Sequence, residues 1–119
     1  MEFCYADRMK LPADTIIARD KVIRYLLVRQ SRSDKAAFLE RGGYSLANPE
    51  ALITGLAAIR NGSEAQMVDN NEFGRYYEVV GVLRGPTGID LRVKTIWMTE
   101  HLSGATKFIT LIPIEVRDQ

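Results

Sequence analysis

The feature that most constrains the fold is a change of periodicity at about Glu64. From there to the C-terminus, β-branched and aromatic residues alternate with polar ones, which is the pattern of strands. Turns of a few residues, containing Gly, Asn, Ser and Pro, separate these segments, and connections this short join antiparallel neighbours. The second half is therefore predicted to be a β-meander, with strands at 65–70, 75–84, 89–99 and 107–116.

The first half shows helical periodicity instead. Ser33 and Asn48 are placed to cap the second and third helices, and Gly42-Gly43 to end the second. Gly55 disfavours helix, so it marks a close contact with another element. The expected helices lie at 19–28, 34–40 and from 49 to about 61. Helices followed by strands predict an α+β fold, with the N-terminal helices packed on one face of a four-stranded antiparallel β-meander.

A length of 119 residues suits a single hydrophobic core. We expect one α+β domain over 11–119, preceded by an N-terminal extension over 1–10, with Met9 as an alternative start to Met1. No apolar run is long enough to cross a membrane and no signal peptide is evident, which predicts a cytoplasmic protein without a membrane partner.

Several chemistries are excluded by composition. Cys4 and His101 are the only residues of their types, so neither an internal disulfide nor a two-histidine acid–base pair can form, and no cluster has metal-ligand spacing. The sequence lacks a glycine-rich phosphate loop of the GxxxxGKS type. We expect neither a metal nor an organic cofactor.

Positive charge is concentrated at the junction of the first two helices. Residues 19–41 contain seven cations and three anions, a net charge of +4, whereas the whole chain carries +1. Arg29, Arg32 and Lys35 lie near the start of the second helix, where free backbone amides also favour an anion. This pattern indicates a phosphate site; the alternative is an ordinary solvated helical surface.

The strand predicted around Asp90–Glu100 presents two different faces. Leu91, Val93, Thr95 and Trp97 share one face, and Arg92, Lys94, Ile96 and Met98 share the other. The cations on a rigid strand suit an anionic ligand, as does Arg75 on the preceding strand. Trp97 is a candidate for stacking on a base, although an aromatic in this position more often belongs to the core.

Three segments carry a resemblance to known proteins: LLVRQSRSDKAAF (Leu26 to Phe38), VKTIW (Val93 to Trp97) and FITLIP (Phe108 to Pro113). With the order of helices and strands, they resemble the small ribonuclease fold of barnase, EndoU, colicin and RelE-type toxins. More closely, they look like a family of short bacterial domains of uncharacterised function, found alone or at the ends of larger toxins. Lys35, Lys94, Thr95, Trp97 and Thr110 match that family.

The resemblance implies a toxin-like, metal-independent ribonuclease that cleaves RNA to a 2′,3′-cyclic phosphate. RNA and a cognate antitoxin or immunity protein are its expected partners. The alternative is a non-catalytic protein-binding module, or an inactive relative of the nuclease. A nuclease requires its site residues to converge, whereas a binding module requires an exposed apolar patch. The expected catalytic residues are Lys35, Lys94, Thr95 and Thr110, and the expected substrate-binding residues are Arg29, Arg32, Arg75, Arg92 and Trp97.

Overall fold

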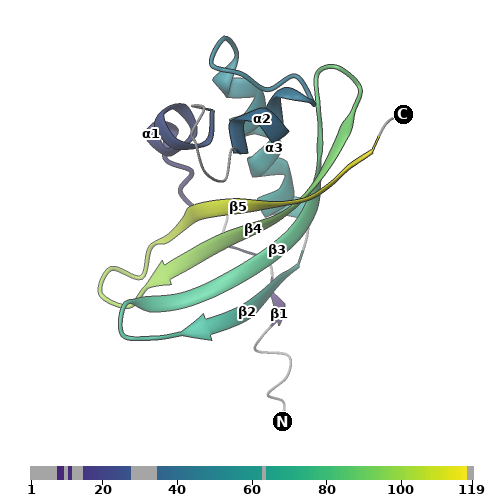
Figure 1. The fold of residues 1–119 in the computed structure, drawn as a ribbon. Helices are drawn as coiled ribbons and strands as arrows, with labels where there is room; N and C mark the ends of the chain where they lie inside the picture. The colour runs from purple at the N-terminus through teal and green to yellow at the C-terminus, as the bar shows by residue number, and fades with distance from the viewer. Residues whose placement is uncertain (1–7, 10, 12–14, 28–34, 63, 118–119) are drawn as a thin grey trace.

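A computed structural model describes residues 8–9, 11, 15–27, 35–62 and 64–117. Its centre is one antiparallel sheet in which each strand pairs with its neighbour in sequence, in the order β1-β2-β3-β4-β5 (Figure 1). The four predicted strands correspond to β2 to β5, so the meander is confirmed. The short β1, which the sequence did not predict, pairs with β2; the rest of the expected extension, 1–7 and 10, lies outside the described residues. The strands are β1 (Arg8–Met9), β2 (Ala65–Asn70), β3 (Gly74–Arg84), β4 (Asp90–Glu100) and β5 (Thr106–Arg117).

The helices lie over one face of this sheet, which confirms the α+β class (Figure 1). The second helix ends as the sequence predicted: Gly43 has a φ of 96°, and the amide of Tyr44 donates to the carbonyl of Leu39 at 3.1 Å. This hydrogen bond pairs one of the backbone carbonyls that have no partner within the helix at its C-terminal end. The predicted cap Ser33 lies outside the described residues. The helical elements are α1 (Arg19–Lys21), which continues into the π-helical turn η2 (Val22–Leu26), α2 (Lys35–Glu40) and α3 (Pro49–Gly62).

Strand β4 is the centre of the core. Its alternation is the one predicted, because Leu91, Val93, Thr95 and Trp97 are all fully buried on the helix side. The ring of Trp97 meets the ring of Phe108 on β5 edge to face, with centroids 5.2 Å apart and planes at 72°. Such pairs add to the stability that burial alone provides. On the opposite face, Arg92, Lys94 and Ile96 are partly exposed, whereas Met98 is buried.

Two glycines allow close packing between the helical layer and the sheet. A Cβ on Gly55 would lie 2.8 Å from Cδ2 of Leu83, so the close contact predicted for this helical glycine is confirmed. A Cβ on Gly85 would lie 2.0 Å from the carbonyl oxygen of Gly42. The hairpin between β3 and β4 therefore touches the backbone just after α2, which fixes that helix against the sheet.

The edge strand β5 is partly covered by the segment that precedes α1. The amide of Ile16 donates to the carbonyl of Thr106, and the amide of Phe108 donates to the carbonyl of Ile16, both at 2.8 Å. Pro113 lies in this edge strand, where its lack of an amide hydrogen is tolerated. Lys21 of α1 and Lys35 of α2 contact the sheet at this same edge.

Candidate functional site

A bulge in β5 brings together residues from three parts of the chain. Ile96 on β4 is in register with Thr110, whereas Trp97 is in register with Phe108, so Ile109 is the extra residue on β5. Bulges turn side chains away from the regular alternation of a strand and are frequent beside functional sites. Here the irregularity lies at the outer edge of the sheet, next to the start of α2.

Two lysines converge on this bulge. Lys35 Nζ, at the start of α2, donates to Thr110 Oγ1 at 2.7 Å, across 75 residues of sequence. Lys21 Nζ, from α1, donates to the carbonyl oxygen of Ile109 at 2.9 Å. Both contacts are only partly buried. Two ammonium groups and a hydroxyl group at one edge form an arrangement that suits an anionic oxygen ligand.

Thr95 and Trp97 are placed differently. The Trp97 indole Nε1–H donates to Thr95 Oγ1 at 2.7 Å, and the Thr95 hydroxyl donates to the carbonyl of Val79 at 2.7 Å. Both side chains have no exposed surface. They lie on the helix side of β4 and are not brought together with Lys94, which is on the other side.

The predicted strand cations do not form one cluster. Lys94 faces away from the core, 38% of its side chain is exposed, and its Nζ lies 3.5 Å from Oε2 of Glu78. Arg92 shares that face by alternation and is partly exposed. Arg75, which is exposed, is in register with Thr99 and therefore lies on the opposite face from Lys94. The structure thus brings Lys35 and Thr110 into contact but separates Arg75 from the others.

Of the basic helix junction, Arg29 and Arg32 lie outside the described residues. Arg19 forms an ion pair with Glu50 at the start of α3, so this cation serves the packing of two helices. Lys21 was visible in the sequence only as one charge of the basic segment. Its contact with Ile109 spans 88 residues, and no local signal in the sequence predicts it.

Two carboxylates on the outer face of the sheet, Glu78 and Glu100, lie apart from each other. Glu78 is in register with Ile96, whereas Glu100 is in register with Gly74 at the far end of β3. Glu100 accepts hydrogen bonds from Lys107 Nζ at 2.9 Å and from the Ser103 hydroxyl at 2.8 Å. These two bonds, with the charge of Lys107, lower the pKa of Glu100 and keep it ionised.

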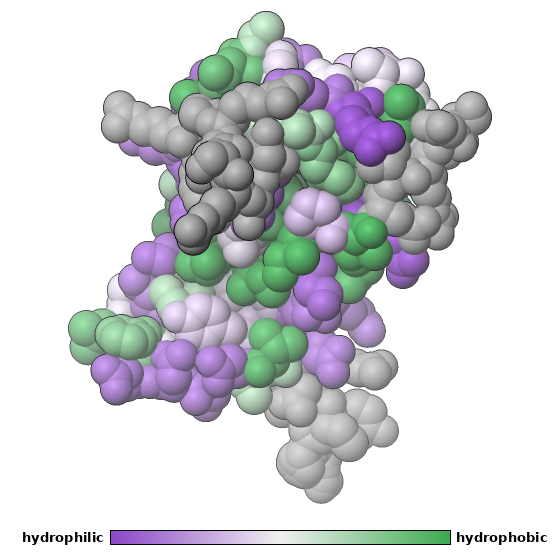
Figure 2. All heavy atoms as spheres, in the orientation of Figure 1, coloured by the Kyte–Doolittle hydropathy of each residue, from purple (hydrophilic) through white to green (hydrophobic). Residues whose placement is uncertain are grey.

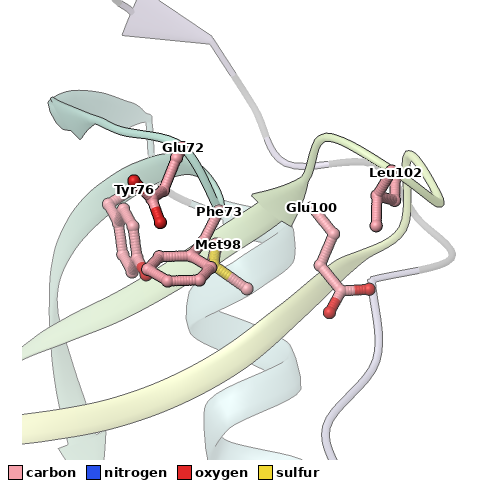
Figure 3. A pocket seen from close by; sticks show the side chains of 6 residues that line it. All are labelled: Glu72, Phe73, Tyr76, Met98, Glu100 and Leu102. Carbon is pink, nitrogen blue, oxygen red and sulfur yellow. The ribbon is translucent and has the colours of Figure 1, made fainter.

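A hollow lies on the outer face of the sheet, between the β2–β3 and β4–β5 loops (Figure 3). Its volume is about 380 Å³. Nothing in the sequence indicated that the two loops would meet. Figure 3 shows the rings of Phe73 and Tyr76 beside the side chain of Met98. The lining residues are Glu72, Phe73, Tyr76, Met98, Glu100 and Leu102.

His101 lies in the β4–β5 turn, and its Nε2 is 2.9 Å from the carbonyl oxygen of Asn71. Within the part of the chain that the structure describes, no group of three or more His, Cys, Asp or Glu residues is placed to hold a metal ion. Among the same residues, none of the helices has the length and apolar character needed to cross a bilayer.

No curated protein matches the sequence. Among solved structures, a chain of a contact-dependent growth inhibition toxin–immunity protein complex from Klebsiella pneumoniae 342 aligns with a TM-score of 0.63 and 18% sequence identity. The alignment covers 87% of this chain and 96% of that chain, so the two share a fold. Residues 10–115 match the model of a domain of unknown function, DUF6883. Because this match spans nearly the whole sequence, the chain belongs to the DUF6883 family.

Proposed function

We propose that this domain is a metal-independent ribonuclease of a bacterial toxin–immunity system, and that it holds the scissile phosphate of RNA at Lys35 and Thr110. The observation that carries the proposal is the 2.7 Å contact between Lys35 Nζ and Thr110 Oγ1. It joins two of the residues expected from the ribonuclease resemblance, although they are 75 positions apart in the chain. The shared fold with a chain of a toxin–immunity complex supports the same proposal.

The reaction needs stabilisation of charge at the phosphate more than it needs an external nucleophile. The ribose 2′-oxygen forms a bond to phosphorus and loses its proton, while the bond from phosphorus to the 5′-oxygen breaks and that oxygen gains a proton. A 2′,3′-cyclic phosphate and a free 5′-hydroxyl result. Lys35 and the Thr110 hydroxyl would donate to the non-bridging oxygens, where negative charge accumulates. We assign no residue to the two proton transfers.

Other cations extend this site along the sheet. Lys21 already lies at the bulge, bonded to the carbonyl of Ile109. Lys94 is in register with Ile112, two positions beyond Thr110 on β5, and would contact a flanking phosphate after exchanging its partner Glu78. Arg92 lies on the same face of β4 as Lys94 and stays in the proposal as a further substrate-binding residue. Arg29 and Arg32, just before Lys35, stay in the proposal as further phosphate contacts.

Thr95 and Trp97 take no direct part in this proposal. Their side chains are fully buried and hydrogen-bonded to each other, so neither reaches a substrate at the surface. Their contribution would be to hold β4 flat against β3, since the Thr95 hydroxyl also donates to the carbonyl of Val79. The face of β4 that carries Lys94 is positioned by this contact.

A second candidate function is a protein-binding module without catalysis. The observation that favours it is the exposure of large apolar side chains on the outer side of the sheet: Val80, Ile112 and Ile114 are each 40–44% exposed. Figure 2 shows apolar spheres across the middle of this face. Exposed apolar patches of this kind often mark protein interaction sites.

The test is cleavage of single-stranded RNA by the purified protein, with analysis of the product ends. We expect fragments that end in a 2′,3′-cyclic phosphate, and a rate about 10²–10³ lower for Lys35→Ala, as for the loss of a donor to a developing anion. Thr110→Val should reduce the rate less, because the ammonium group remains. Arg84→Ala is the control, since Arg84 is 79% exposed and pairs only with Asp90 among the contacts described. Intact RNA with folded wild-type protein would favour the binding module.

A further inference from the structure

The two loops at the far end of the sheet form a surface that the proposed ribonuclease does not use. The hollow shown in Figure 3 lies between them. None of its lining residues belongs to the phosphate site at Lys35 and Thr110. Leu102 is fully exposed and Phe73 is 65% exposed, so both apolar side chains stand in solvent at the tips of their loops. Two large apolar side chains exposed at the same hollow form a patch of the kind that marks interaction sites.

Hydrogen bonds hold the two loops together. The backbone amide of His101 donates to the carbonyl of Phe73 at 3.1 Å, and the His101 ring contacts the carbonyl of Asn71 at 2.9 Å. The Asn71 side chain accepts in turn from the amide of Phe73 at 2.9 Å. A Cβ on Gly74 would collide with the carbonyl oxygen of Thr99, so a residue larger than glycine does not fit at the start of β3 without a shift of the backbone. The loops therefore present Phe73 and Leu102 in a fixed arrangement, which lowers the entropic cost of binding.

The rim of the hollow is acidic. Glu72 is exposed and makes no ion pair with any residue that the structure describes. Glu100 is held ionised by Lys107 and Ser103. Residues 64–76 contain three carboxylates and one arginine, and that Arg75 lies on the other face of β3 from Tyr76. Because Glu100 is paired with Lys107, Glu72 supplies the negative charge beside the apolar floor, and this complements an apolar group next to a cation.

We propose that this surface, defined by Phe73, Tyr76, Met98 and Leu102 with Glu72 and Glu100 at its rim, docks a partner protein through a segment that inserts an apolar side chain next to a lysine or arginine. The apolar side chain would lie between Phe73 and Leu102, over Met98. The cation would face Glu72, which forms no ion pair within the described part of the chain. The inference does not depend on RNA cleavage, because the two surfaces share no residue.

The experiment is selection from a random-peptide library displayed on phage, with the wild-type domain as target. The recovered peptides are synthesised and their affinities measured by fluorescence polarisation. We expect them to share an apolar residue next to lysine or arginine. They should bind Leu102→Asp and Glu72→Lys at least about tenfold more weakly, as expected for loss of a central anchor and of its charge partner. Leu46→Asp is the matched control, because Leu46 is 52% exposed but lies between α2 and α3.

Circular dichroism verifies that each variant is folded, and Leu102→Asp should cleave RNA as the wild type does. The proposal is overturned if no peptide is enriched on the wild type over Leu102→Asp, or if the enriched peptides carry acidic flanks. It is also overturned if Leu46→Asp weakens binding as much as Leu102→Asp. If single-stranded RNA binds the wild type but binds Leu102→Asp much more weakly, the surface binds nucleic acid and the proposal is overturned.

Discussion

Replacing Thr95 by valine tests whether this residue has a structural role in the core. Valine keeps nearly the same shape but removes the hydroxyl that accepts from Trp97 Nε1 and donates to the carbonyl of Val79, both at 2.7 Å. All three residues are fully buried, so water cannot replace the missing partner. The indole N–H would be left unsatisfied inside the core.

The expected cost follows from these two bonds. Loss of the Thr95–Val79 hydrogen bond destabilises by about 1 kcal/mol, and a buried N–H without a partner adds about 1–3 kcal/mol, which predicts a total of about 2–4 kcal/mol. In a Trp97→Phe background the N–H is absent, so the same Thr95→Val change should cost only about 1 kcal/mol. The difference between the two backgrounds is the coupling energy of the pair.

The assay is urea denaturation of the four proteins of this cycle, followed by far-ultraviolet circular dichroism. Fluorescence is unsuitable because Trp97 is the only tryptophan and is replaced in two of the four proteins. The comparison requires that the four proteins have the same m-value, which is the slope of the unfolding free energy against urea concentration. A cost of Thr95→Val below about 0.5 kcal/mol, or the same cost in both backgrounds, would refute the buried hydrogen-bond chain.

Two further predictions concern packing and pH. Gly85→Ala should destabilise the fold by about 1–3 kcal/mol, because the new methyl group would collide with the carbonyl of Gly42. Gly62→Ala is the control: no atom lies within 4 Å of the new methyl group at the end of α3, so the change should be neutral or stabilising by up to about 1 kcal/mol. Equal shifts of the two variants in thermal unfolding would contradict this packing. The lowered pKa of Glu100 contributes stability that is present above the ordinary carboxyl pKa and lost as pH falls through the lower folded pKa. Lys107→Met should raise the Glu100 pKa toward its ordinary value in an NMR titration of the carboxyl carbon, and an unchanged pKa would contradict the assignment of its cause.

Much of the fold could be predicted from the sequence because its determinants are local. The alternation of residues 90–100 was sufficient to place Thr95 and Trp97 on one face and Lys94 on the other. The glycines after α2 marked its end, and Gly55 within α3 marked a close contact that turned out to be with Leu83. Short turns between strands required antiparallel neighbours, which gave the strand order β2 to β5.

The candidate site depends on long-range register, which the sequence does not display. The bulge at Ile109 is visible only when β5 is paired with β4, and it decides where Thr110 lies. The contacts of Lys21 and Lys35 with β5 span 88 and 75 residues, so no spacing rule could predict them. The alternation of β4 separated Thr95 from Lys94, but only the structure shows that the Thr95 hydroxyl is satisfied inside the core.

The measurement that tests the central proposal most directly is growth of a bacterial host after induced expression of the wild type, Lys35→Ala and Arg84→Ala. We predict arrest with the wild type and with Arg84→Ala, accompanied by RNA fragments ending in a cyclic phosphate, and normal growth with Lys35→Ala at equal soluble protein. Normal growth and intact RNA in all three strains, with soluble protein verified, would contradict the ribonuclease. Arrest that persists with Lys35→Ala would contradict the assignment of the site to Lys35 and Thr110.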